Sequence, residues 1–130
     1  MLFRSGDRPT LGVMDLSFIS LTKVLPTLWK LLVQEKEVVL LVKPQFEVGR
    51  EQVGKKGVVR DPKAQAQAIQ KIIDCVKELG WQVHGLTWSP ITGPAGNIEF
   101  LLWLQNVPTD FELTEQDVSE LTQSAIASLR

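Results

Sequence analysis

The chain has 130 residues, of which 44% are hydrophobic, and this composition fits one globular domain and argues against intrinsic disorder. Its 14 Lys and Arg residues nearly balance 15 Asp and Glu residues, which gives a formal net charge of −1. Domains that bind nucleic acid on their own are usually basic overall. Any contact with nucleic acid must therefore come from a local patch or from another part of the protein.

The chain contains one cysteine, Cys75, and one histidine, His84. A single cysteine excludes an internal disulfide, and these two residues alone cannot form a His/Cys zinc site, so we expect no metal. Both are interpreted as structural residues in a reducing compartment. The sequence has no uninterrupted run of about 18 apolar residues and no secretory signal. We therefore expect a cytoplasmic protein without a membrane partner.

The first elements alternate between strand and helix patterns. Residues 11–15 form a short apolar run that ends in an acid, which predicts a buried strand. Residues 19–32 are apolar at roughly helical spacing, and either the helix kinks at Pro26 or it begins near Leu25 with the proline in its first turn. Residues 38–42 are continuously β-branched or aliphatic, which is typical of a parallel strand covered on both faces.

A long loop and a second helix follow. Residues 45–61 contain three glycines and many charges, and an ordered loop of this length usually has a function. Asp61 has the character of an N-cap before Pro62 at the first helical position. Residues 63–79 have a helical pattern, which Gly80 ends.

The last part of the chain predicts two strands and a helix. Residues 81–87 and 98–104 are the strands, and the turn-rich residues 89–97 connect them. Residues 113–129 have a weaker helical period. The start of this helix matches the aspartate form of the capping box, with Thr114 as the cap and an acid three residues later.

This order of strands and helices is an α/β pattern. We expect a mostly parallel sheet with one antiparallel strand, because a short loop leads to the last strand. In open α/β sheets, ligands bind beyond the carboxyl ends of the parallel strands. Asp15 and Lys43 fall at such ends. Glu99 lies at the start of the last strand, and if that strand is antiparallel, its start lies at the same edge of the sheet. The sequence therefore predicts a site at this edge before any family is considered.

A lysine held between two carboxylates can bind a hydroxyl group, and in its neutral form it can act as a base. Each of the three residues also has a structural interpretation. Asp15 could cap a helix, Lys43 could be a solvated strand end, and Glu99 could lie at the surface.

Four segments carry a more specific pattern: VMDLSFISL at 13–21, LVKPQFE at 41–47, GVVRDP at 57–62 and SPITGPAGNIEF at 89–100. In this order they resemble the TlyA family of ribosomal RNA 2′-O-methyltransferases, often labelled haemolysins, whose catalytic domain is similar to FtsJ. The resemblance covers roughly residues 11–104. It implies the C-terminal half of a Rossmann-like sheet, S-adenosylmethionine as cofactor, and ribosomal RNA as substrate, with cytidine as the methylated nucleotide. Nothing in the chain suggests pore formation.

FtsJ-like enzymes use a Lys-Asp-Lys-Glu tetrad. The resemblance makes Asp15 the acid, Lys43 the second lysine and Glu99 the glutamate. No residue matches the first lysine, the glycine-rich loop that holds the cofactor, or the family's small amino-terminal RNA-binding domain. The resemblance therefore implies a partial methyltransferase domain over residues 1–107, followed by a C-terminal helical extension over residues 108–130.

Basic residues of the long loop could contact RNA phosphates. The candidates are Arg50, Lys55, Lys56 and Arg60, with Lys63 at the start of the next helix. The alternative is a solvated loop whose charges are balanced by Glu47, Glu51 and Asp61.

Further residues are expected near the cofactor or substrate. They are Ser17, Phe18, Pro44, Ser89 and Asn97. Three aromatic residues beside the site, Phe18, Phe46 and Trp88, could stack on a base, but core packing is the more common use of such residues.

Three interpretations of the whole chain stay open. It is part of an enzyme that is nearly inactive without its upstream segment, or a non-catalytic RNA-binding or pseudoenzyme module, or a truncated piece without activity. In the last case residues 11–15 form an unnatural sheet edge, and we expect a homodimer or aggregation through it.

Overall fold

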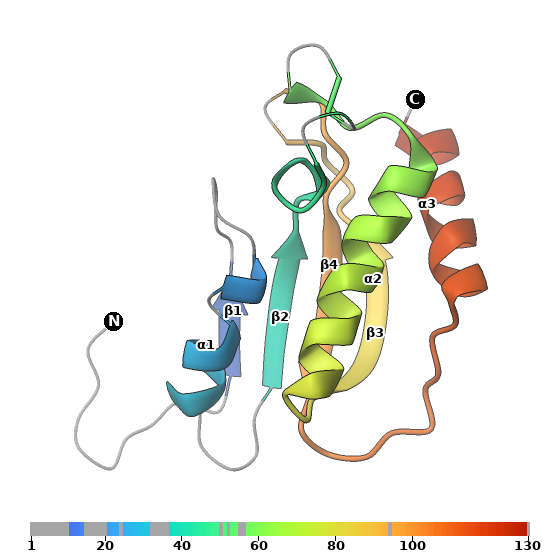
Figure 1. Cartoon of the computed structure of the whole chain (residues 1–130). Helices are drawn as coiled ribbons and strands as arrows, with labels where there is room; N and C mark the ends of the chain where they lie inside the picture. Colours follow the sequence, from blue (N-terminus) through green and yellow to red (C-terminus); the bar gives the residue numbers. More distant parts are fainter. Residues whose placement is uncertain are drawn as a thin grey trace.

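The computed structural model describes residues 11–14, 21–23, 25–31, 37–49, 51, 53–54, 57–93 and 95–129. The elements follow the predicted order of strands and helices (Figure 1). They are β1 (Leu11–Met14), η1 (Leu21–Lys23), α1 (Leu25–Leu31), β2 (Glu37–Val42), η2 (Pro44–Phe46), α2 (Pro62–Glu78), β3 (Gln82–Trp88), β4 (Phe100–Gln105) and α3 (Glu115–Leu129), where η denotes a 3₁₀-helix.

The four described strands form one sheet in the order β1-β2-β4-β3. β1 pairs with β2 in parallel, and β4 lies between β2 and β3 and runs antiparallel to both. The expected antiparallel last strand is confirmed. The expected parallel pairing is seen only between β1 and β2, because β4 separates β2 from β3 and makes the other two ladders antiparallel. The described sheet is therefore mixed.

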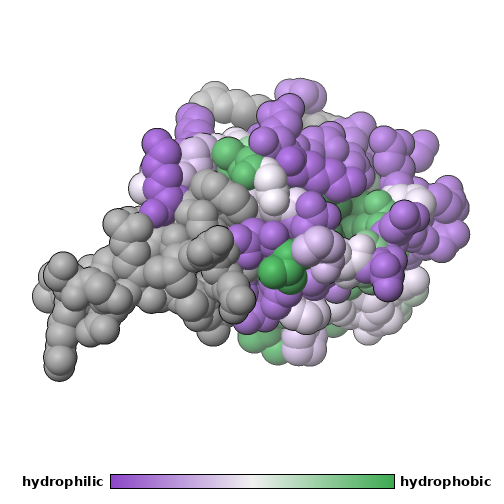
Figure 2. Space-filling model, turned by 90° about the horizontal axis from the view of Figure 1, so that it is seen from below, coloured by the Kyte–Doolittle hydropathy of each residue, from purple (hydrophilic) through white to green (hydrophobic). Residues whose placement is uncertain are grey.

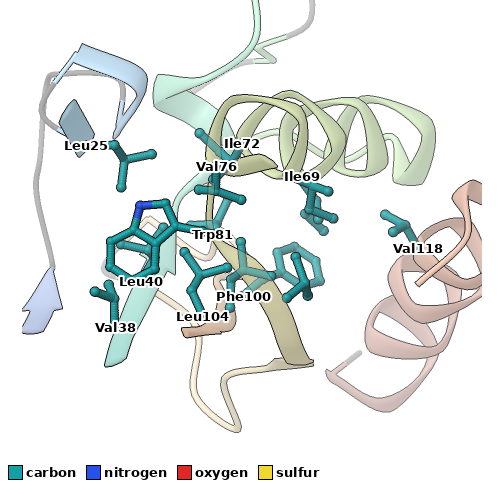
Figure 3. Close-up of a cluster of buried hydrophobic side chains, with 14 of the residues drawn as sticks. Leu25, Val38, Leu40, Ile69, Ile72, Val76, Trp81, Phe100, Leu104 and Val118 are labelled. Carbon is teal, nitrogen blue, oxygen red and sulfur yellow. The ribbon is translucent and has the colours of Figure 1, made fainter. Parts of the chain in front are cut away.

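One face of the sheet packs against α2 and α3 (Figure 1). The strands contribute alternate residues to this core, as the two-residue period of a strand requires. These are Val38, Leu40 and Val42 of β2 and Phe100, Leu102 and Leu104 of β4, all fully buried. Figure 3 shows the indole of Trp81 lying between Leu25 of α1 and Val38 of β2, so one large side chain connects the first helix to the sheet.

α1 begins at Leu25 with Pro26 in its first turn. This matches the second of the two alternatives for the apolar stretch, in which the missing proline N–H falls where a helix has no internal acceptor. Residues 19, 20, 24 and 32 of the predicted helix lie outside the described residues. None of the helices in the described part of the chain combines the length and hydrophobicity that a bilayer crossing requires.

Both ends of α2 have the predicted caps. The Asp61 carboxylate accepts a hydrogen bond of 3.0 Å from the Lys63 N–H. At the other end, Trp81 N–H donates to the Val76 carbonyl at 3.0 Å, and Gly80 has φ of 92°, which a residue with a Cβ rarely adopts. Trp81 therefore completes the helix cap, and for this reason β3 begins one residue later than the sequence predicted.

α3 begins with the predicted capping box. Asp117 N–H donates to the Thr114 hydroxyl at 3.1 Å, and Thr114 N–H donates to the Asp117 carboxylate at 3.0 Å. The apolar side of the helix packs against α2 and the core, where Val118, Thr122 and Ala125 are buried. The terminal helix thus shares the core of the sheet.

The end of the molecule at which β2 begins has a mainly polar surface. Seen from this end, apolar residues lie singly among hydrophilic ones (Figure 2). The exposed large apolar side chains of the described residues are Ile91, Trp103, Val107 and Phe111. Isolated exposed apolar residues are ordinary on a protein surface, so these four side chains require no functional explanation.

Candidate active site

The carboxyl ends of β2 and β3 meet the start of β4 at the top of Figure 1. Phe100 of β4 pairs with Val42 on one side and with Trp88 on the other. The residues just beyond this row are Lys43, Glu99 and Ser89, and Ser89 N–H donates to the Glu99 carbonyl at 2.8 Å. The structure therefore brings Lys43 and Glu99 to one edge of the sheet.

Lys43 and Glu99 also share a side of the sheet. Val42 and Phe100 both point into the core and are fully buried. Lys43 keeps an extended backbone, with φ of −112° and ψ of 100°. Because side chains alternate along a strand, Lys43 and Glu99 are directed away from the α2 face. Lys43 and Glu99, both half-buried residues, thus lie at the same end and on the same side of the sheet.

The loop between β3 and β4 folds back on Glu99. Gly93 N–H donates to the Asn97 carbonyl at 2.8 Å, and Gly96, with φ of 91°, closes a turn onto the Gly93 carbonyl. A Cβ atom added at Gly93 would lie 3.0 Å from Oε2 of Glu99. The Glu99 carboxylate therefore rests against the bare Cα of Gly93, which limits where it can move.

Asn97 joins this loop to the long loop before α2. It is 3% exposed. Its Oδ1 accepts a hydrogen bond of 2.9 Å from Val59 N–H, and its Nδ2 donates to the Gly57 carbonyl at 2.8 Å. Gln65 Nε2 donates to the Val59 carbonyl at 3.2 Å. The sequence placed Asn97 near a ligand but missed this role, because its bonding partners lie about forty residues earlier in the chain.

The alternative interpretation of the long loop had Glu47 balance charge in solvent, and for Glu47 the structure contradicts it. Its side chain is 2% exposed, and Lys71 Nζ of α2 lies 3.4 Å from Glu47 Oε1 and 3.2 Å from the Glu47 carbonyl. Burying a carboxylate requires such a partner. The contact ties η2, and with it the segment after Lys43, to α2. The position of Glu47 between Phe46 and Val48 was the available signal of burial.

Several predicted site residues lie outside the described residues. They are Asp15, Ser17, Phe18, Arg50, Lys55 and Lys56. Of the others, Arg60 is exposed directly after the segment that Asn97 holds, and Pro44 is buried at the start of η2. Trp88 packs against the hydrophobic core, which favours its structural interpretation over base stacking, and Phe46 is half-buried.

His84 and Cys75 have structural surroundings. His84 Nε2 lies 3.1 Å from the Val107 carbonyl. The centroids of the His84 and Trp103 rings are 5.3 Å apart, and the two rings are tilted relative to each other. Burial raises the pKa of the Cys75 thiol, and the Glu78 and Glu47 carboxylates raise it further. A raised pKa leaves little reactive thiolate near neutral pH.

The described residues at this edge do not by themselves fit S-adenosylmethionine. Three described glycines have positive φ. Gly80 caps a helix, and Gly57 and Gly96 lie in two loops that the hydrogen bond from Asn97 Nδ2 to the Gly57 carbonyl connects. A cavity of about 370 Å³ is lined by α2, β3 and residues 109–114, and another of about 340 Å³ by α2 and α3; neither is lined by Lys43 or Glu99. The edge offers groups that can bind a hydroxyl, and neither of these two cavities opens onto it.

Residues 2–106 match the FtsJ-like methyltransferase family. This is most of the chain, and the chain therefore belongs to that family. The resemblance found in the sequence is thereby confirmed.

Two relatives and one solved structure show the same relationship. The chain is 44% identical over 122 residues to the 16S/23S rRNA (cytidine-2′-O)-methyltransferase TlyA of Mycobacterium tuberculosis, covering 94% of this chain and 45% of TlyA. It is 45% identical over 125 residues to YqxC of Bacillus subtilis, a candidate rRNA methyltransferase, covering 94% and 44%.

A candidate hemolysin of Streptococcus thermophilus superposes with a TM-score of 0.85 at 38% identity, over 95% of this chain and 45% of that structure. The chain thus spans less than half the length of these three proteins.

Proposed function

We propose that this chain carries the catalytic lysine and glutamate of an S-adenosylmethionine-dependent ribosomal RNA ribose 2′-O-methyltransferase, with cytidine as the methylated nucleotide. The observation that carries the proposal is the pairing of Val42 with Phe100, which sets Lys43 and Glu99 at one edge. The identity to a relative named as a cytidine-2′-O-methyltransferase supports the substrate. A ribosomal substrate also supports action in the cytoplasm.

A ribose 2′-hydroxyl is a weak nucleophile, so it must be held in place and lose its proton. Lys43 in its neutral form accepts that proton on Nζ. Glu99, fixed against Gly93, accepts an N–H of the amine and so orients its lone pair toward the hydroxyl. Asp15, directly after β1, is assigned as the second carboxylate beside the lysine. S-adenosylmethionine, when bound, supplies the methyl group.

We also propose that the glycine-rich cofactor loop, the first tetrad lysine and the RNA-binding domain lie outside these 130 residues. This assignment makes residues 1–107 a partial, Rossmann-like methyltransferase domain and residues 108–130 a C-terminal extension. Titration calorimetry of the chain with S-adenosylmethionine is expected to show no saturable binding at micromolar concentrations. Stoichiometric tight binding would contradict this division of the cofactor site.

A chimera tests the catalytic proposal itself. In it, this chain replaces the matching part of the Mycobacterium tuberculosis relative, which supplies the remaining residues. Methyl transfer from labelled S-adenosylmethionine to ribosomal RNA is expected for the chimera and not for its Glu99→Gln variant. A chimera that folds and binds RNA but never transfers methyl would favour the alternative function, a non-catalytic RNA-binding module. The observation that favours this alternative is that neither of the two cavities described above is lined by Lys43 or Glu99.

The RNA face is assigned to the loop residues Arg50, Lys55, Lys56 and Arg60. The logarithm of the binding constant falls as the logarithm of the salt concentration rises. Each lost contact between a cation and a phosphate reduces the steepness of this fall by about one. Substituting Lys55 and Lys56 together should therefore reduce the slope by about two. An unchanged slope would remove this pair from the RNA face.

We further propose that the chain alone pairs with a second copy through β1. In the described sheet β1 is the outermost strand and pairs only with β2. A strand edge with unpaired backbone groups promotes association. Light scattering is expected to give a mass that rises with concentration, and a constant monomer mass would contradict the proposal.

A further inference from the structure

Before α2, backbone hydrogen bonds join Gly54 to Gly57 and Val58, close to Arg60. Gly54 N–H donates to the Val58 carbonyl at 2.8 Å, and Gly57 N–H donates to the Gly54 carbonyl at 3.2 Å. Gly57 has φ of 73°, so glycine suits this turn. Backbone bonds thus shape the turn itself, but none of them attaches it to the sheet.

Two buried amide side chains attach the segment to its surroundings, Asn97 of the loop between β3 and β4 and Gln65 of α2. Asn97 bonds the Gly57 carbonyl and the Val59 N–H, while Gln65 bonds the Val59 carbonyl. Both backbone groups of Val59 are therefore held by side chains, and Asn97 and Gln65 are 3% and 1% exposed. Arg60 directly follows Val59 and is exposed. Its backbone is therefore attached, through Val59, to the Asn97 side chain.

Asn97 is equally connected to the catalytic edge. It stands two residues before Glu99 in the chain, and its own carbonyl accepts the Gly93 N–H at 2.8 Å. Gly93 in turn lies against the Glu99 carboxylate. Asn97 therefore contacts both regions. Its side chain bonds the segment that precedes Arg60, and its backbone carbonyl bonds the Gly93 that lies against Glu99.

We propose that Asn97 is a positioning residue that fixes the RNA-phosphate contact of Arg60 relative to the Glu99 carboxylate at the catalytic edge. The inference rests on the proposed RNA 2′-O-methyltransferase function. Phosphate contacts set the register of a nucleic acid on a protein. A fixed distance between such a contact and the catalytic edge selects which ribose along the strand reaches Lys43.

Asparagine suits this role because it presents an acceptor and a donor at once. In Asn97→Asp, one oxygen still accepts from Val59 N–H, but the other faces the Gly57 carbonyl and repels it. In Asn97→Ala both bonds are lost. The two variants therefore loosen the Arg60 segment to different degrees while leaving Arg60 itself in place.

The test measures the salt dependence of RNA binding by the whole chain. Fluorescence anisotropy with a labelled ribosomal RNA fragment is recorded over a range of KCl concentrations for the wild type, Asn97→Ala, Asn97→Asp, Arg60→Ala and the Asn97→Ala/Arg60→Ala double variant. Arg60→Ala is expected to lower the slope by about one. Asn97→Ala should reduce the steepness of the slope by nearly as much, and Asn97→Asp by less. The slope of the double variant should be no shallower than that of Arg60→Ala.

Thr122→Val is the matched control for stability. Thr122 is fully buried in α3, and its hydroxyl donates to the Ser119 carbonyl at 2.8 Å, away from both loops. This variant also loses a buried hydrogen bond, and its salt slope is expected to equal that of the wild type. If Asn97→Ala does not fold, as circular dichroism would show, Asn97→Asp provides the comparison.

The outcomes separate the inference from the function on which it rests. A slope that falls in Arg60→Ala but not in the Asn97 variants overturns the positioning role and leaves the RNA face intact. Additive decreases in the double variant overturn it as well, because they show that Asn97 acts independently of Arg60. A wild-type slope that Arg60→Ala does not change overturns the assigned RNA face, and the inference with it.

Discussion

Val42 pairs with Phe100 at the carboxyl end of β2, and the two side chains are fully buried in the same core. Lys43 directly follows β2, and Glu99 directly precedes β4. The candidate catalytic pair is thus supported by backbone that the hydrophobic core holds in register. For this reason, changes to the two polar side chains should be separable from changes in folding.

Lys43→Met is expected to reduce methyl transfer by the chimera about 10²- to 10⁴-fold, the usual range for loss of a general base. The free energy of unfolding should change by less than about 1 kcal/mol, because the side chain is only half-buried. Single-turnover methylation and urea unfolding measure the two effects. Lys77→Met, an exposed lysine at the far end of α2, is the control and should leave transfer unchanged. Full activity in Lys43→Met would exclude Lys43 as the base.

Gly93→Ala should disturb the chemistry more than the fold. The new Cβ would lie 3.0 Å from Oε2 and 3.4 Å from Cδ of Glu99, so the carboxylate must shift by a few tenths of an ångström. Gly93 is not among the glycines with positive φ, so alanine does not strain its backbone. We expect roughly a tenfold loss of methyl transfer, since small misplacements of catalytic groups have large effects, with nearly unchanged stability.

Gly96→Ala is the complementary variant for this loop. No atom lies within 4 Å of a Cβ at Gly96, but its φ of 91° disfavours any residue other than glycine. The substitution should lower the free energy of unfolding by about 1–2 kcal/mol. If Gly93→Ala lowered stability as Gly96→Ala does, the loss of activity would reflect misfolding of the loop and not a displaced Glu99.

Local signals in the sequence predicted the helix ends and the site edge. Asp61 before Pro62, Gly80 after the helix, and Thr114 with an acid three residues later each specify a cap through neighbouring residues. The sequence placed Lys43 and Glu99 beside strand ends, which are short-range features, whereas the pairing of Val42 with Phe100 that brings them together joins distant parts of the chain. Helix caps and strand ends can be predicted because the residues that determine them lie within a few positions of one another.

Features that depend on distant partners could not be predicted in this way. The sequence indicated that β4 runs antiparallel, but it did not show that β4 lies between β2 and β3, because strand order depends on tertiary packing. The bonds of Asn97 reach Val59 across 38 residues, and Lys71 reaches Glu47 across 24. Asparagine and lysine are ordinary in loops and on helices, so their composition gave no sign of these contacts.

Lys71→Met should destabilise the chain by about 1–2 kcal/mol. The substitution leaves the Glu47 carboxylate, which is 2% exposed, without its ion-pair partner. Removing one member of a buried pair is strongly destabilising, but Lys71 is itself 45% exposed, which reduces the effect. Urea unfolding at pH 7 measures the change, with Lys77→Met on the same helix as the control. The double variant Lys71→Met/Glu47→Gln should recover part of the loss, and equal destabilisation of the two single lysine variants would contradict the argument.

The capping box of α3 predicts a pH dependence of stability at low pH. Hydrogen bonds from the backbone N–H and side chain of Thr114 lower the pKa of Asp117. A carboxyl group whose pKa is lower in the folded state binds its proton more readily when unfolded. Its stabilisation is therefore fully present above the ordinary aspartate pKa of about 3.9 and is lost as the pH falls through the lowered folded value.

The variant Asp117→Asn tests this dependence. Wild type should be more stable than the variant at pH 6, and the difference between their urea midpoints should shrink as the pH is lowered from about 4 toward 2. Asp110→Asn removes the same charge from the connection before α3, outside the capping box, and is the matched control for the loss of a carboxylate. A gap between wild type and Asp117→Asn that stayed constant down to pH 2 would mean that the neutral acid caps the helix as well as the carboxylate does. In that case the Thr114 N–H would not be stabilising a charge.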